Sequence, residues 1–105
     1  MAIEPDALPK LADESRRGKE ALNIITAPVY SDAMKALKTE IIDKWAACPA
    51  RDTEGREWLW QHYQTALKFE LILQNIMETG KMADITLQQE SILDTATRRV
   101  TNLWR

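Results

Sequence analysis

The side chains most capable of chemistry in this sequence stand alone. His62 is the only histidine and Cys48 the only cysteine. A metal site needs several His, Cys or carboxylate ligands at suitable spacing, and no such set surrounds either residue. Glu54 and Glu57 are three residues apart on a helix, but no second acidic pair faces them to complete a two-metal bundle. We therefore interpret His62 as a histidine at the edge of a core and Cys48 as a small core residue.

Sequence signatures of enzymes are also missing. The chain has no glycine-rich phosphate loop. Ser15, Ser31 and Ser91 lie in no nucleophile motif. We expect a non-enzymatic protein without catalytic residues, metal ligands or cofactors.

Composition and charge narrow the possible partners. The chain has 105 residues, enough for one domain, with 45% hydrophobic and 29% charged residues and a net charge of −2. These values are typical of globular proteins. The basic footprint of a nucleic-acid binder is absent, and no stretch approaches the ~20 apolar residues of a membrane span. The acidic N-terminus does not have the form of a signal peptide. We expect synthesis in the cytoplasm, and neither nucleic acid nor membrane as a partner.

The stretch from Thr53 to Gly80 predicts one long amphipathic helix. Asp52 or Thr53 can cap its start, and Gly80 can end it in a left-handed conformation. At 100° per residue, its main apolar face is wide enough to contact two neighbouring helices. The side chains on this face are Trp58, Leu59, His62, Tyr63, Ala66, Phe69, Ile72, Leu73, Ile76 and Met77.

A second, narrower apolar stripe runs along the opposite side of the same helix. It consists of Trp60, Leu67 and Leu71, and we call it the Trp60 stripe. Either the rest of the chain covers it as internal core, or it is a contact between subunits, where aromatic anchors are enriched. Because a chain of this size has few other helices that could cover the stripe, we favour the subunit contact.

The predicted fold class is all-α, organised around an antiparallel helical hairpin. Apolar residues from Tyr30 to Cys48 recur at helical spacing and predict a helix over about 29–48. The short connection from Pro49 to Asp52 makes this helix an antiparallel neighbour of the next, over about 53–79.

Two further helices complete the predicted domain. One covers about 10–27, where Pro28 ends or kinks it. The other covers about 87–103, and Thr86 with Gln89 resembles a capping box at its start.

The ends of the chain carry separate predictions. Residues 1–9 contain two prolines and predict an extended arm, whereas residues 10–105 predict a single helical domain. Trp104 either folds back on the core or docks on a neighbour. We include it with the Trp60 stripe among the predicted interface residues.

One segment resembles a known class of proteins. The run Arg51–Leu87, RDTEGREWLWQHYQTALKFELILQNIMETGKMADITL, is similar to a segment of small helical proteins from tailed bacteriophages. The shared features are a charged helix start, a long helix bearing Trp or Tyr, and an end such as ETGKMA. The resemblance covers about a third of the chain and implies a phage origin, a place in the virion after synthesis in the host cytoplasm, and no site residues.

Two functions remain open from the sequence. The first is a phage structural protein, a small helical subunit that forms a homo-oligomer and binds a larger virion protein in a connector, decoration or accessory role. The second is a helical antagonist that sequesters a small ligand or blocks a host defence factor. The second needs a positively lined pocket, for which Arg51, Arg56, Arg98 and Arg99 are the candidates.

Overall fold

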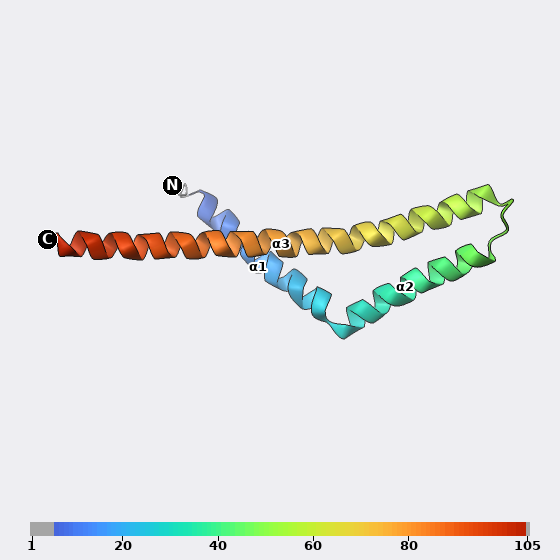
Figure 1. Ribbon diagram of the computed structural model, residues 1–105, viewed down its shortest axis with the longest axis horizontal. Coiled ribbons are helices and arrows are strands. Elements are labelled where there is room, and N and C mark those ends of the chain that lie inside the picture. Colours follow the sequence, from blue (N-terminus) through green and yellow to red (C-terminus); the bar gives the residue numbers. More distant parts are fainter. Residues whose placement is uncertain (1–5, 105) are drawn as a thin grey trace. The chain divides into compact units, whose positions relative to one another are not determined.

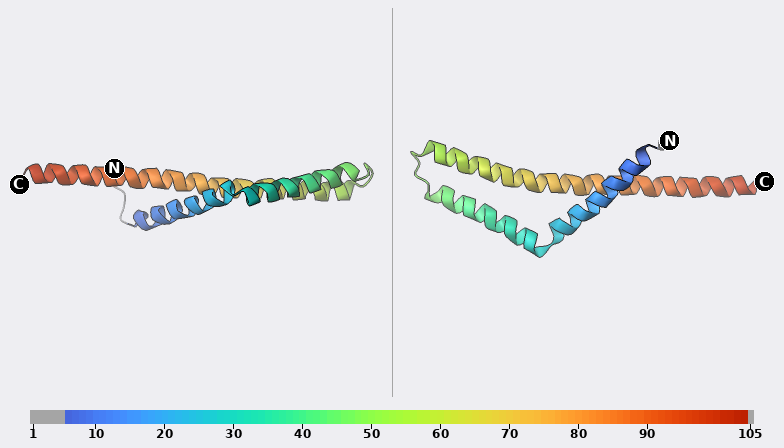
Figure 2. Two further views of the ribbon diagram at one scale, coloured as in Figure 1. Left: turned by 90° about the horizontal axis from the view of Figure 1, so that it is seen from below. Right: turned by 180° about the vertical axis from the view of Figure 1, so that it is seen from behind.

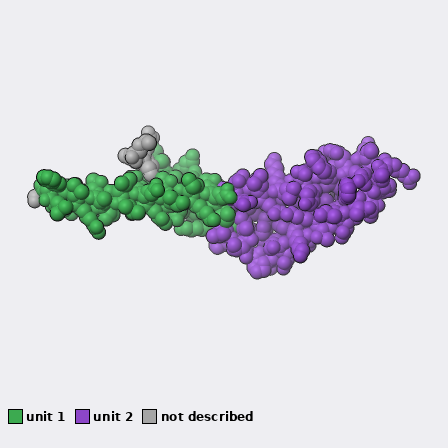
Figure 3. Space-filling view, viewed as in Figure 1, with its two compact units in different colours: residues 1–21, 76–105 green, residues 22–75 purple. Residues whose placement is uncertain are grey.

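The computed structural model describes residues 6–104 and contains three helices over that range. They are α1 (Ala7–Thr26), α2 (Pro28–Ala47) and α3 (Thr53–Leu103), shown in Figure 1. No strand occurs among the described residues, which confirms the prediction of an all-α fold. The chain divides into two compact units, which Figure 3 shows in different colours. Residues 22–75 form one unit, and α1 up to Ala21 with α3 from Ile76 forms the other.

The unit of residues 22–75 contains the predicted antiparallel hairpin. Pro28 occupies the first turn of α2, where its missing N–H leaves no intrahelical bond unmade. Asp52 caps α3, because its Oδ1 accepts a hydrogen bond from the Gly55 N–H at 3.0 Å. Two further views of the chain show α2 turning back along α3 through the short loop between them (Figure 2). Pro28 therefore marks the start of α2 and Asp52 marks the start of α3, as the sequence predicts.

The seam between α2 and α3 is thin. Its best buried side chains are Ile41, Leu59 and Ala66, which are 8%, 7% and 5% exposed. Lys38 on α2 forms an ion pair with Glu70 on α3, and this pairing raises the pKa of the lysine. A single row of buried residues and one ion pair leave much of the hairpin's apolar surface uncovered.

The predicted helix end at Gly80 is wrong. α3 continues through Gly80 to Leu103, and no glycine of the chain has a positive φ, so Gly80 does not take the left-handed capping conformation. The predicted capping box is also absent, because Thr86 lies inside the helix and its hydroxyl donates to the Met82 carbonyl at 2.9 Å. The segments predicted as 53–79 and 87–103 are thus parts of one helix.

In the unit formed by α1 up to Ala21 and α3 from Ile76, α1 crosses α3 (Figure 1), and Gly18 and Gly80 meet at the crossing. A Cβ added at Gly80 would lie 2.5 Å from the Cα of Gly18, and one added at Gly18 would lie 2.6 Å from the Cα of Gly80. Ser15, only 6% exposed, donates a hydrogen bond from its Oγ to Asp84 Oδ1 at 3.3 Å. The two backbones touch here, so glycine is needed for its missing side chain.

The helix α1 starts at Ala7 and takes in Leu8 and Pro9, which the sequence assigned to an extended arm. Proline is tolerated in a first helical turn. Residues 1–5 of the predicted arm lie outside the residues that the structure describes.

Candidate interaction surfaces on the hairpin

The Trp60 stripe lies on the surface of the hairpin. Trp60 and Leu71 are each 55% exposed, and Leu67 is 37% exposed. The rest of its own unit, residues 22–75, therefore does not cover the stripe as internal core. Three large apolar side chains in a row on one helix side form a contiguous patch, which monomeric proteins rarely leave open unless it has a function.

The main apolar face of α3 is only partly covered. α2 reaches its middle, at Leu59 and Ala66, but Trp58, Phe69 and Ile72 remain about half exposed. The sequence predicted that this face would contact two neighbouring helices. Within the hairpin a single helix packs along it, and one helix is too narrow to cover a face of this width.

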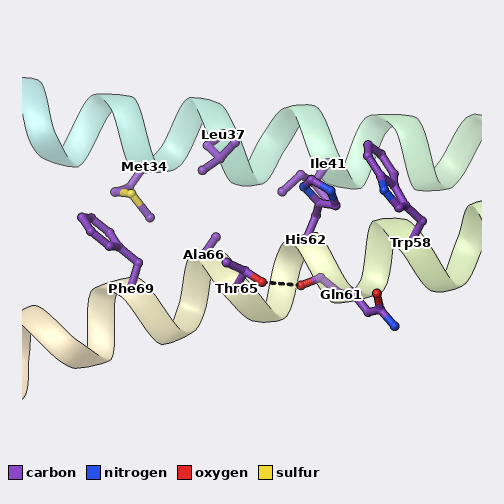
Figure 4. Close-up of a pocket in the computed structure, with 9 residues that line it drawn as sticks. All are labelled: Met34, Leu37, Ile41, Trp58, Gln61, His62, Thr65, Ala66 and Phe69. Carbon is purple, nitrogen blue, oxygen red and sulfur yellow. Dashed lines mark hydrogen bonds between the residues drawn. The ribbon is translucent and has the colours of Figure 1, made fainter.

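A groove follows this exposed side of the hairpin, and we call it the Phe69 groove. Its volume is about 510 Å³, and Figure 4 shows its lining. Phe69 on α3 lies opposite Met34 on α2 at one end, and Trp58 lies at the other end, with the small side chain of Ala66 between them. The complete lining is Met34, Leu37, Ile41, Trp58, Gln61, His62, Thr65, Ala66 and Phe69.

The polar groups of the Phe69 groove are neutral or weakly basic. The Thr65 hydroxyl is already used, because it donates to the Gln61 carbonyl at 2.9 Å (Figure 4). His62 lies against Trp58, with ring centroids 3.9 Å apart and an interplanar angle of 47°. His62 is exposed and does not lie in the buried seam, so it belongs to the groove wall. No lysine or arginine lines this groove.

The Trp60 stripe borders a second, smaller hollow on the other side of the seam. Its volume is about 150 Å³, and it is lined by Ile41, Ile42, Trp45, Leu59, Trp60 and Tyr63. Only Ile41 lines both hollows. The hairpin therefore has two distinct apolar sides separated by its thin core.

Arg56 closes the loop end of the hairpin. Its guanidinium lies 4.3 Å from the centre of the Trp45 ring, within the range of a cation–π interaction. It also donates to the Cys48 carbonyl at 3.2 Å. These contacts occupy the Arg56 guanidinium at the loop end of the hairpin, and Arg56 lines neither of the two hollows.

Cys48 is only partly buried and is not the core residue that the sequence predicted. Its Sγ lies 3.7 Å from Asp52 Oδ2. Burial raises the pKa of the thiol, and the negative charge of Asp52 raises it further, while Arg56 opposes the change. A thiol that resists ionisation is a poor nucleophile.

The unit that contains the end of α3 also exposes apolar side chains, along the helix and at Trp104 just after it. They are Met82, Ile85, Ile92, Leu93, Val100, Leu103 and Trp104. Trp104 is 84% exposed, so it does not fold back on a core within the described chain.

The described residues contain no group of three or more potential metal ligands. None of the three helices has a window apolar enough to cross a membrane. Comparison with known proteins finds no matching family model, no similar curated protein and no similar solved structure.

Proposed function

We propose that this chain is a non-enzymatic helical subunit that associates with copies of itself and binds a larger protein, in the manner of small assembly proteins of phage virions. The Trp60 stripe carries the proposal. Its side chains lie on a regular helix and are exposed in the single chain. Burial of such residues is the main favourable term in protein association, and tryptophan is enriched among residues that dominate interface energies.

The remaining exposed surface supports a second contact with a different protein. The apolar side chains of α3 between Met82 and Trp104 lie in the other unit, so they can serve a partner without competing for the hairpin. The virion as the place of assembly is implied by the resemblance of residues 51–87 to phage proteins.

The antagonist function has less support. A binder of anionic small molecules needs cationic side chains in its pocket, and the lining of the Phe69 groove has none. Among the proposed cations, Arg56 contacts Trp45, and Arg98 pairs with Asp94 at 3.1 Å. A thermal-shift screen with nucleotides tests this function, because a ligand that binds only the folded state raises the melting temperature.

The experiment for the proposed function is a measurement of molar mass by light scattering coupled to size-exclusion chromatography. We expect the wild-type chain to elute as an oligomer. We expect the double variant Leu67→Glu/Leu71→Glu, the stripe variant, to remain helical but to elute as a smaller species, because burying unpaired charge in an interface is strongly unfavourable. A wild-type chain that is monomeric at all concentrations would refute the proposal.

A matched control is available on the same helix. Ser91 and Thr95 are exposed and are also four residues apart on α3, outside the hairpin unit. The variant Ser91→Glu/Thr95→Glu adds the same two carboxylates to the same helix, with the same change in net charge, without touching either side of the hairpin. We expect it to elute as the wild type does.

A further inference from the structure

The two apolar sides of the hairpin are not equivalent. Successive residues of an α-helix are rotated by 100°, so Trp60 points about 200° around α3 from Trp58. Trp58 and Phe69 therefore line one side, and Trp60 and Leu71 line the other. A subunit with two different faces can bind a copy of itself in two ways: each face with its like, or one face with the other.

Each side offers enough apolar area for one interface. A half-exposed aromatic side chain presents roughly 100 Å², and Trp58 and Phe69 on one side, like Trp60 and Trp45 on the other, are each about half exposed. Half-exposed aliphatic neighbours raise each side to roughly 300–500 Å². A standard interface buries about 800 Å² per partner, of which rather more than half is apolar. The hairpin thus exposes enough apolar area for two interfaces, one on each side.

The two sides also match in length and in their position along the axis of α3. The Phe69 groove runs from Trp58 to Phe69, and the Trp60 stripe runs from Trp60 to Leu71. Each spans the same number of residues, about 16 Å along the helix, and they lie over the same three turns. Two copies placed side by side with α3 parallel therefore bring a stripe opposite a groove with a shift of only two residues, about 3 Å along the helix.

Shape favours the unlike pairing. The Phe69 groove is a hollow of about 510 Å³ lined by Ala66 between Trp58 and Phe69, whereas the hollow beside Trp60 has only about 150 Å³, and the exposed Leu67 and Leu71 line neither hollow. A groove facing a second copy of itself would enclose a cavity, and cavities are destabilising in packed interfaces. A groove facing the stripe is filled.

From these observations we infer that the Trp60 stripe of one copy packs into the Phe69 groove of the next, and this inference rests on the self-association proposed above. Such a contact is head-to-tail. Every bound copy leaves one groove and one stripe free at the ends of the assembly, so growth continues until the rotation between neighbours closes a ring.

A mixing experiment with two variants tests the unlike pairing. The stripe variant (Leu67→Glu/Leu71→Glu) keeps an intact groove. The groove variant, Thr65→Glu/Phe69→Glu, keeps an intact stripe. Both pairs are four residues apart on α3, as are the control positions Ser91 and Thr95, and all three variants add two carboxylates in place of two neutral side chains, so they differ only in where the carboxylates lie.

We expect each variant alone to be monomeric by native mass spectrometry, and an equimolar mixture to form a heterodimer that grows no further. Like-with-like pairing gives the opposite result: each variant alone forms a dimer through its intact face, and mixing adds nothing. That result, or a mixture that stays monomeric beside an oligomeric wild type, would overturn the inference while leaving self-association in place. A monomeric wild type would overturn both.

Circular dichroism identifies a variant that fails to fold, and a cross-linking experiment then replaces the mixing test. In a Cys48→Ser background, Thr65→Cys and Leu67→Cys place one thiol on each side at nearly the same height of α3. We expect oxidation of the mixture to give a disulfide-linked dimer of the two different variants, with each variant alone giving at least fivefold less. Equal or greater linkage within one variant alone would overturn the inference.

Discussion

Replacement of Gly80 by alanine has two opposite effects on stability, one on helix propensity and one on packing at the α1–α3 crossing. In a helix interior, alanine is favoured over glycine by about 0.8–1.0 kcal/mol, so an isolated helix would gain stability. At the crossing, the new Cβ would lie 2.5 Å from the Gly18 Cα and 2.8 Å from the Glu14 carbonyl oxygen. Carbon atoms in contact are about 3.5–4.0 Å apart, so the two helices must move apart by about 1 Å.

The free energy lost by moving the two helices apart is larger than the free energy gained from helix propensity. A gap of this size removes about a quarter to a half of each dispersion contact along the crossing, and the atoms in the way belong to a helical backbone, which cannot rotate aside as a side chain can. Overpacking costs about 1–3 kcal/mol, and we expect the upper end here. Subtracting the helix propensity leaves a net destabilisation of about 2 kcal/mol. We expect the same direction for Gly18→Ala, and a double variant that costs less than the sum because one separation makes room for both methyl groups.

The assay must report on α1 itself. Hydrogen exchange of the α1 amides in the full chain measures its undocking, and the rate of tryptic cleavage after Arg16 or Arg17 gives an independent measure. Ser91→Ala, at an exposed site on α3, controls for helix propensity and is expected to be neutral or slightly stabilising. If Gly80→Ala slows exchange in α1, as propensity alone predicts, the backbone contact between the helices does not exist in solution and our reasoning is refuted.

Three further predictions concern the hairpin. Asp52→Ala removes the side-chain acceptor at the start of α3 and should lower the free energy of unfolding by about 1 kcal/mol, measured by urea titration at fixed protein concentration; an unchanged midpoint would contradict the cap. Tyr30→Phe should stabilise the chain by about 1 kcal/mol in the same titration, because the Tyr30 hydroxyl is buried without a hydrogen-bond partner in the described chain; a loss of stability would mean that the hydroxyl has a partner. Alkylation of Cys48 by iodoacetamide should be slower than that of a free cysteine at pH 8 and should rise with pH, because the folded chain raises the thiol pKa. In the folded chain the thiol stays protonated to a higher pH than in the unfolded chain. The stability that this contributes is therefore present below the thiol pKa of the unfolded chain, and it is lost as the pH rises through the thiol pKa of the folded chain. An alkylation rate at pH 8 equal to that of the urea-unfolded chain, measured by mass spectrometry, would contradict the shift.

The hairpin could be predicted because its signals are local. Pro28 and Pro49 fix where helices can begin or end, Asp52 caps the helix that follows it, and the loop is too short for any but an antiparallel return. Each of these rules acts within a few residues of its own position, so the sequence alone is sufficient to apply it.

The role of Gly80 could not be predicted in the same way. A glycine after an apolar helical run has the local pattern of a helix end, and only contact with Gly18, far away in the chain, gives it another purpose. Two signals in the sequence pointed toward the observed structure. No proline follows Pro49, and the buried residues of α1 are the small side chains Ser15, Gly18 and Ala21, spaced by three as on one helix side.

The sequence predicted the positions of the candidate surfaces but not how much of them the fold covers. The periodicity of α3 located both apolar sides and identified Trp60, Leu67 and Leu71 as exceptional. It could not show that α2 covers only the middle of the main face, because the width of that contact depends on tertiary packing. The residues of the Phe69 groove on α3 were therefore assigned to contacts with neighbouring helices.

The positions of the four tryptophans give each unit its own spectroscopic label. Trp45, Trp58 and Trp60 belong to the hairpin, and Trp104 belongs to the other unit. Intrinsic fluorescence of the whole chain is thus weighted toward the hairpin. A chain in which Trp104 is the sole indole would give a signal from the far end of α3, and its emission should shift to the blue only when a partner shields that end from water.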